Sequence, residues 1–171
     1  MSSIRIQPLI AELLHLVDAA EHRIHHCLRQ LSDEQIWQRP RPEMNSIANQ
    51  ILHVCGNLKQ WGVDGTLGTP SDRDRDAEFS ADRSGGKEVV LDKLTHTLAQ
   101  VRKVVSEVSA EQLERHRVIQ GFEVSGLGAL THTIPHLVGH THQIMQLTRW
   151  ILGNDYQFDW TPDGDRSSVP L

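Results

Sequence analysis

The sequence predicts an all-α protein built as a four-helix bundle. Four segments repeat apolar residues at the three- and four-residue spacing that places them on one helix face. Residues 117–125 alternate in the manner of an extended stretch or hairpin, which is too short to form a sheet-based core. With 171 residues, of which 38% are hydrophobic and 23% charged, the chain is long enough to bury a core without disulfides. We therefore expect residues 1–171 to form one helical domain.

The first helix is expected over residues 7–31. Its apolar stripe consists of Leu9, Leu13, Val17, Ala20, Ile24 and Leu31. Residues 32–35, Ser-Asp-Glu-Gln, have the form of a capping box, in which a serine and a glutamine side chain accept from backbone amides at the start of a helix. Prolines at positions 40 and 42 then break the chain, so the second long helix must start after them.

The second helix is expected to start near Ser46 and to end near Gly62 or Gly65. Its apolar seam consists of Ile47, Ile51, Val54, Leu58 and Trp61. A polar stripe runs directly beside this seam and consists of Gln50, His53, Asn57 and Gln60. A polar row next to an apolar seam is at least half buried in a bundle, and buried polar groups cost free energy unless they find partners. A metal ion shared with another helix would satisfy this row.

Residues 66–86 form a long connection between the second and third helices. The stretch is rich in Asp, Arg, Ser and Gly, and it includes the run Asp-Arg-Asp-Arg-Asp at residues 72–76. Connections of this length are uncommon in compact domains unless they cross the fold or cover a site. Two interpretations remain open at this point: the charges mark a solvated connection, or the segment is a lid.

The third helix is expected over residues 87–108, followed by a second capping-box sequence at residues 109–112. The fourth is expected over residues 125–152, and Gly153 ends it. It carries an apolar seam made of Leu130, Ile134, Leu137, Thr141, Ile144, Thr148 and Ile151. A second seam beside it consists of His136, His140, Gln143, Leu147 and Trp150. Residues 156–171 have no periodicity and are expected to form an irregular tail.

Histidine placement is the most informative chemical feature of the chain. Residues 131–143 hold four of the eleven histidines, and His136 and His140 are four residues apart, so they share one helix face. Two neutral imidazoles in this arrangement suit one divalent metal, and His53 adds a third ligand if the two polar stripes face each other. Three protein ligands with an open position are typical of catalytic metal sites. The competing interpretation is that these are core or surface histidines with ordinary hydrogen bonds.

Further polar residues lie one helical turn from the proposed ligands. Asn57 follows His53 and Gln143 follows His140, so their amides are candidates to hold a bound water or a ligand N–H. His132 extends the histidine row and is a candidate outer ligand or pocket residue. Neither ligand stripe carries an Asp or Glu, so the stripes offer no general base.

Three motifs of this chain resemble the DinB/YfiT-like superfamily, and together they span most of its length. They are His132-x3-His136-x3-His140-x2-Gln143, Ser46-Ile47-Ala48 followed by His53, and the lead-in Ser32-Asp33-Glu34-Gln35-Ile36-Trp37-x2-Pro40. The resemblance implies an up-down-down-up bundle with a long crossover between its second and third helices. It also implies a homodimer and a divalent metal, Ni²⁺ or Zn²⁺, bound by His53, His136 and His140.

The same resemblance implies that the relatives of this chain include transferases and isomerases that use low-molecular-weight thiols. Many members carry a run similar to His-His-Arg-Gly-Gln, whereas this chain has Thr141-His142-Gln143 after His140, and this departure leaves the substrate open. We expect a metalloenzyme that activates a thiol or a water for transfer to, or hydrolysis of, a small electrophile. The alternative is a non-catalytic metal- or ligand-binding bundle.

Composition excludes several other functions. A net charge of −5 gives no electrostatic reason to expect binding to nucleic acid or to an anionic membrane. We expect no signal sequence, because Met1 is followed by Ser-Ser-Ile-Arg-Ile and not by a basic and then an apolar segment, and no apolar run reaches membrane-spanning length. Cys27 and Cys55 are too few and too far apart for a disulfide framework. A cytoplasmic protein acting on a small molecule is therefore expected.

Overall fold

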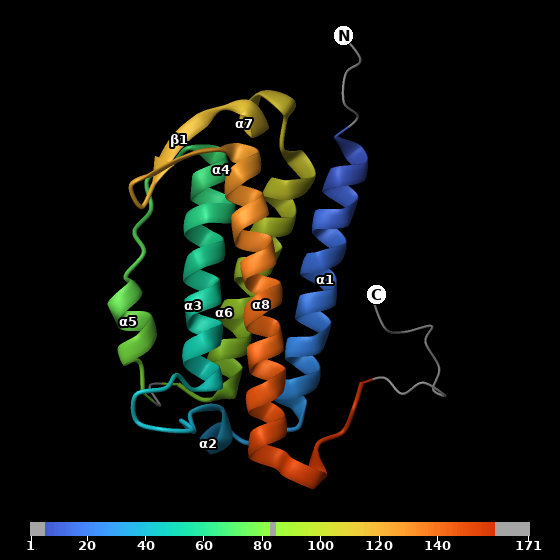
Figure 1. Cartoon of the computed structure of the whole chain (residues 1–171), viewed down its shortest axis with the longest axis vertical. Coiled ribbons are helices and arrows are strands. Elements are labelled where there is room, and N and C mark those ends of the chain that lie inside the picture. Colours follow the sequence, from blue (N-terminus) through green and yellow to red (C-terminus); the bar gives the residue numbers. More distant parts are fainter. Residues whose placement is uncertain (1–5, 83–84, 160–171) are drawn as a thin grey trace.

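Four long helical segments form the frame of the protein, and the computed structural model describes residues 6–82 and 85–159. Three of them are α1 (Gln7–Arg29), α6 (Lys87–Glu107) and α8 (Gly126–Leu152). The remaining one consists of α3 (Ile47–Asn57), the π-helix η1 (Leu58–Asp64) and α4 (Gly65–Leu67) in direct succession. The predicted all-α class is thus confirmed, and Figure 1 shows the four segments packed side by side.

The order of the helices requires a long crossover. In Figure 1, α1 and α8 run downward, whereas the α3–α4 segment and α6 run upward. Because α3 and α6 start at the same end of the bundle, the chain that leaves α4 at the opposite end must run back along the full length of the bundle before α6 begins. The crossover that the sequence analysis expected between these helices occupies this path.

Aliphatic seams fill the space between the helices. The largest fully buried side chains are Ile24, Leu28, Ile36, Ile47, Ile51, Leu58, Leu94, Leu98, Leu130, Ile134, Leu137 and Ile144. Their removal from water drives the four segments together. Trp61, which was expected on the apolar seam of the second helix, lies instead in a smaller cluster with Ile119 and Ala129. Within the described ranges, no helix is long and apolar enough to cross a membrane.

The second bundle helix runs further than its glycines suggest. The predicted end near Gly62 or Gly65 is wrong, because helical structure continues through η1 to Leu67. The helix ends at Gly68, whose φ of +77° lies in the left-handed region that favours glycine. Both earlier glycines are buried inside the bundle, where packing outweighs their low helix propensity of about 1 kcal/mol.

Short-range signals in the sequence are realised where they were expected. Capping boxes form at Ser32, ahead of α2 (Asp33–Ile36), and at Ser109, ahead of α7 (Ala110–Glu114). Strands β1 (His116–Ile119) and β2 (Phe122–Ser125) then pair as an antiparallel hairpin. After α8 the chain forms a single 3₁₀ turn, η2 (Gly153–Asp155). The predicted tail lies outside the described residues from residue 160 onward.

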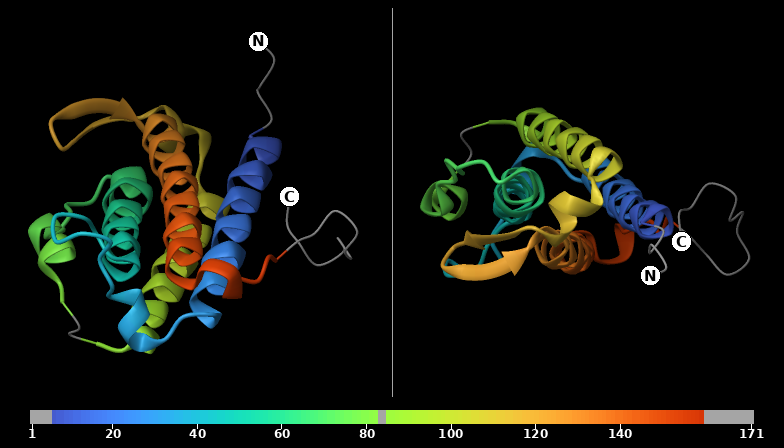
Figure 2. Two further views of the ribbon diagram at one scale, coloured as in Figure 1. Left: turned by 60° about the horizontal axis from the view of Figure 1, so that its bottom comes forward. Right: turned by 90° about the horizontal axis from the view of Figure 1, so that it is seen from above.

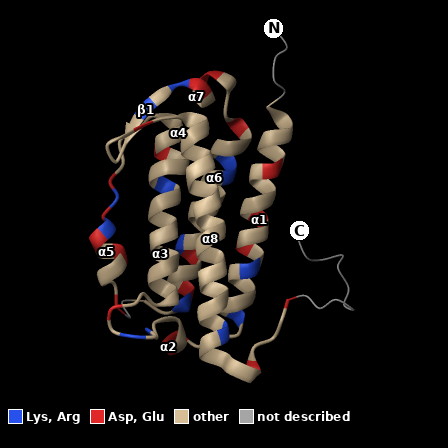
Figure 3. Ribbon diagram, in the orientation of Figure 1, with Lys and Arg blue, Asp and Glu red and all other residues tan. Residues whose placement is uncertain are grey.

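The crossover contains a helix that the sequence analysis did not predict. This helix, α5 (Arg75–Ser80), begins at Asp74, whose side chain accepts from the amide of Ala77. Figures 1 and 2 show α5 lying against the outer side of α3. Acidic and basic residues alternate along the approach to it in Figure 3. We call residues 69–82 the strap.

Two side chains fasten the strap to the bundle. Asn49 Nδ2 donates to the carbonyl oxygens of Glu78 and Ala81, at 3.0 and 2.9 Å. Arg39 Nη2 donates to the carbonyl oxygen of Phe79 at 2.9 Å. Asn49 is fully buried and its hydrogen bond to Glu78 lies away from water, whereas the bonds to Ala81 and Phe79 are partly buried. The strap is therefore solvated on one side only, and its other side covers α3.

Candidate metal centre

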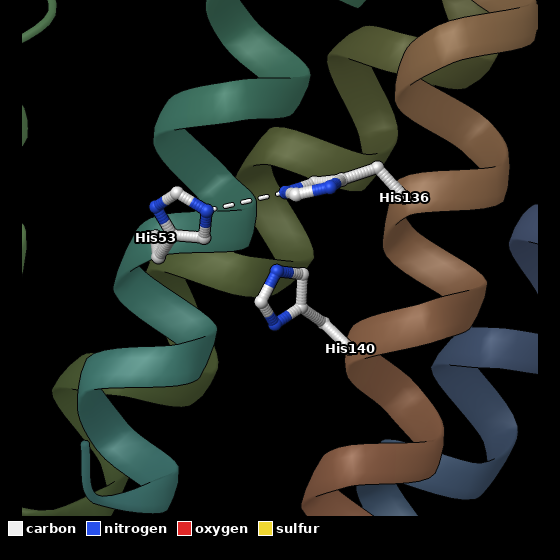
Figure 4. A group of neighbouring side chains, drawn as sticks. All are labelled: His53, His136 and His140. Carbon is white, nitrogen blue, oxygen red and sulfur yellow. Dashed lines mark hydrogen bonds between the residues drawn. The ribbon is translucent and has the colours of Figure 1, made fainter. Parts of the chain in front are cut away.

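Three histidines converge at the interface between α3 and α8. His53 extends from α3, whereas His136 and His140 extend from successive turns of α8, and all three rings point toward one another in Figure 4. The Nε2 atoms of His53 and His136 are 3.2 Å apart. One ligand nitrogen from each ring lies within 4.8 Å of the other two. The structure thus brings together the three side chains that the sequence analysis selected.

The spacing of these nitrogens fits a divalent metal ion. Nitrogen ligands at about 2.1 Å from one metal lie about 3.0–3.4 Å apart. The contact between His53 and His136 already has this separation. His140 supplies the third nitrogen, at most 4.8 Å from the others. The donor set, three imidazoles and no thiolate, suits a divalent transition-metal ion.

Burial and mutual repulsion keep the α8 histidines neutral. Desolvation, followed by smaller contributions from the neighbouring rings of His140, His53 and His132 and from Arg73, lowers the pKa of His136 to about 4. Desolvation also lowers the pKa of His140 to about 4, with a smaller contribution from His53. Both rings are therefore unprotonated at neutral pH, which is the form that binds a metal.

Polar residues orient the His140 ring. Its Nδ1 lies 2.5 Å from Gln50 Oε1, and because an amide oxygen only accepts, Nδ1 carries the proton. The Nε2 atom of His140 is then left with its lone pair. Gln143, which the sequence analysis proposed as an outer residue, acts on the same ring, because its side chain raises the pKa of His140 against the larger effect of burial. Gln50 belongs to the predicted polar stripe of α3, and the structure shows which partner it meets.

Glu78 of the strap contacts the third ring. Its Oε2 lies 3.0 Å from His53 Nδ1, and Arg73 binds both of its carboxylate oxygens, at 2.7 and 2.8 Å. Burial by itself raises the pKa of Glu78, but the hydrogen bonds from Arg73 and His53 outweigh burial and hold the pKa below its ordinary value. The carboxylate is therefore ionised at neutral pH. The Phe79 ring covers the same imidazole, with ring centroids 4.9 Å apart.

Two other predicted outer residues have different roles. Asn57 accepts a hydrogen bond from Thr133 Oγ1 at 2.7 Å and so joins α3 to α8 one helical turn from His53. The ring of His132 packs against Trp61 at a tilt of 36°, with ring centroids 4.1 Å apart, and lies nearly parallel to His136 at 5.9 Å. The ring of His132 therefore borders the site, and its side chain is exposed.

Sequence reasoning missed Glu78 and Arg73. The two helix stripes carry no acidic residue, and Glu78 and Arg73 lie in a polar stretch whose composition is typical of a solvated connection. One signal was present in the sequence, because Phe79 is an aromatic residue in an otherwise polar segment. An aromatic side chain in such a connection indicates that part of it packs against the core.

Comparison with known proteins assigns this arrangement to a family. Residues 7–165 match the family described as "Protein of unknown function (DUF1572)". The chain belongs to this family. The DUF1572 match includes all four bundle helices, the strap and the three histidines. Comparison with curated proteins gave no match.

Solved structures share the fold. A conserved protein from Enterococcus faecalis aligns with a TM-score of 0.70 at 17% identity, over 88% of this chain and 99% of that one. A DinB-like protein from Bacillus subtilis aligns with a TM-score of 0.65 at 12% identity, over 86% of this chain and 96% of that one. A DinB-like protein from Bacillus cereus also gives 0.65, at 15% identity, over 85% of this chain and 91% of that one. These alignments show that the chain has the fold of DinB-like proteins.

Proposed function

We propose that this protein is a metal-dependent enzyme that transfers a thiol to, or hydrolyses, a small electrophile. His53, His136 and His140 would hold one divalent ion, Ni²⁺ or Zn²⁺. The observation that carries the proposal is the convergence of three histidines from two helices, two of them with a pKa lowered to about 4, on one point beside the strap. Perturbed, partly buried groups of this kind are common at functional sites.

A divalent ion held by three neutral imidazoles keeps its full charge and lowers the pKa of a coordinated thiol or water. The protein residues prepare the site for that chemistry. Gln50 holds the His140 ring, and Phe79 covers the His53 ring with apolar surface. A rigid and partly desolvated ligand set of this kind favours binding of a small anionic nucleophile.

The position of Glu78 favours a thiol over water as the nucleophile. Its carboxylate faces the Nδ1 side of His53, and both its oxygens are bound by Arg73. It is therefore not free to take a proton from a water on the Nε2 side, where the three rings meet. A thiol needs less help from a general base than water, because its ordinary pKa is about 8.5 and a metal brings it below neutrality. We accordingly propose a low-molecular-weight thiol as a substrate.

The test begins with metal analysis of protein purified without a histidine tag. Turnover is then measured for a panel of small electrophiles and esters, with several low-molecular-weight thiols and with water alone. We expect thiol-dependent turnover that chelation removes and that Zn²⁺ or Ni²⁺ restores. Activity that survives complete metal removal would refute the mechanism. Stoichiometric metal without turnover on any substrate would favour the non-catalytic metal-binding bundle instead.

A further inference from the structure

The strap places a charged pair against the outer edge of the proposed metal centre. Glu78 and Arg73 come from the strap and not from the four bundle helices, yet their side chains are only 6% and 5% exposed. Arg73 also donates to Gln60 Oε1 at 3.1 Å, so its guanidinium is tied to both the strap and η1. Burying a carboxylate and a guanidinium costs free energy even when they are paired. We therefore expect the buried pair of Glu78 and Arg73 to have a role other than stabilising the fold.

The backbone of α3 is shaped to admit this pair. A Cβ atom added at Gly56 would overlap Glu78 Oε1 and would lie 2.9 Å from Arg73 Nε. Glycine at this position therefore allows the carboxylate to approach the helix one turn from His53. On the opposite side, Asn49 holds the backbone carbonyl of Glu78. Residues on two sides of the same imidazole thus fix where the Glu78 carboxylate lies.

The Glu78 contact determines which nitrogen of His53 is available to a metal. Figure 4 shows one His53 nitrogen turned toward His136 and the other turned away from α8. The outer nitrogen, Nδ1, lies 3.0 Å from Glu78 Oε2 and 3.1 Å from Arg73 Nη2. A carboxylate only accepts and a guanidinium only donates, so these two contacts select opposite tautomers. Arg73 Nη2 also donates to Glu78 Oε2, at the shorter distance of 2.8 Å.

We propose that Glu78 is a positioning residue for metal binding: it accepts the Nδ1 proton of His53 and so holds Nε2 as the lone-pair nitrogen that faces His136 and His140. Arg73 fixes the carboxylate in this position. The proposal rests on the proposed metal function, and it makes the strap a component of the site. Carboxylates that accept from a ligand imidazole orient the ring and increase its basicity, and their loss typically weakens metal binding about 10- to 100-fold.

The first experiment measures Zn²⁺ affinity by competition with a chelator. We expect Glu78→Ala to weaken binding about 10- to 100-fold. Glu78→Gln should weaken it less, because the amide oxygen still accepts from Nδ1. Asp76→Ala, an exposed acidic residue of the same α5 helix, should match the wild type. Wild-type affinity in both Glu78 variants would overturn the proposal, and circular dichroism checks that each variant is folded.

A glycine pair tests the geometry without altering any ligand or charge. Gly56→Ala should displace the Glu78 carboxylate and weaken Zn²⁺ binding. Gly139→Ala, on α8 next to His140, adds a methyl group that meets no atom within 4 Å and should leave the affinity unchanged. Equal affinities in the two variants would contradict the proposal, because both substitutions raise helix propensity alike.

The tautomer of His53 provides a signature that does not depend on metal. Long-range ¹H–¹⁵N spectra of the metal-free protein should show the proton on Nδ1 in the wild type and a shift toward the Nε2-protonated form in Glu78→Ala. A proton on Nε2 in the wild type would mean that Arg73 is the donor, and this result would overturn the role of Glu78. A wild-type protein that binds no Zn²⁺ refutes the proposed function itself. Wild-type binding with unchanged Glu78 variants refutes the positioning role alone.

Discussion

Replacing Asn49 with alanine should detach the strap from the bundle. Asn49 occupies the third position of α3, where its Oδ1 accepts from Ser46 N and Oγ at 3.3 and 2.8 Å. Its Nδ2 donates one hydrogen bond to each of two strap carbonyls, those of Glu78 and Ala81. One buried side chain therefore starts the helix that carries His53 and holds the segment that covers it.

The expected loss of stability follows from these contacts. Each carbonyl left without its buried donor costs about 1 to 1.5 kcal/mol. Loss of the capping-box acceptor adds about 0.5 kcal/mol. Asn49→Ala should therefore lower the free energy of unfolding by about 3 kcal/mol. Gln112 has the same capping-box position in α7, where its Oε1 accepts from Ser109 N at 2.9 Å. Because its side chain does not hold a second segment in this way, Gln112→Ala should cost only about 0.5 to 1 kcal/mol.

Urea unfolding of the metal-free protein, followed by circular dichroism, measures both values. Limited trypsin digestion adds a local readout, because Arg75 is exposed in the strap and a detached strap is cleaved faster there. We expect faster cleavage in Asn49→Ala than in Gln112→Ala. If the two variants differ by less than about 1 kcal/mol and are cleaved at the same rate, the reasoning that Asn49 clasps the strap is wrong.

Three further predictions concern the metal centre and assembly. His140→Ala should abolish stoichiometric metal binding. His142→Ala should retain it, because the exposed His142 ring hydrogen-bonds to the Val138 carbonyl of its own helix. Equal metal content in the two variants would overturn the ligand assignment. Folding lowers the pKa of His136 and His140 to about 4 from about 6.5. Between these two pH values the unfolded state therefore binds more protons than the folded state. The free energy of unfolding of the metal-free protein should accordingly fall as the pH drops from about 6.5 to about 4. A variant with glutamine at both positions should lose most of this pH dependence, and an unchanged dependence would contradict the cause. We also expect a homodimer, as the family resemblance implies, and light scattering that gives a monomer mass at micromolar concentration would count against it.

Local sequence signals predicted most of the fold because they act over a few residues. A capping box needs only a side chain and the backbone three residues away, so Ser32 and Ser109 could be assigned without knowledge of the tertiary structure. The ligand stripes were also predictable, since a period of 3.6 residues places His136 and His140 on one face. The end of the second helix was not, because a buried glycine can continue a helix when packing favours it.

The sequence by itself determined the all-α class, the helical seams and the two stripes that carry His53, His136 and His140. Only the tertiary structure decided that these stripes face each other and that Glu78 and Arg73 from the strap complete the outer edge of the site. The physical reason is the distance along the chain over which each interaction acts. Helical periodicity is set by neighbouring backbone hydrogen bonds, whereas the contact of Glu78 with His53 joins residues 25 positions apart. Such a contact depends on where the whole crossover lies, and that path is set by the packing of the bundle as a unit.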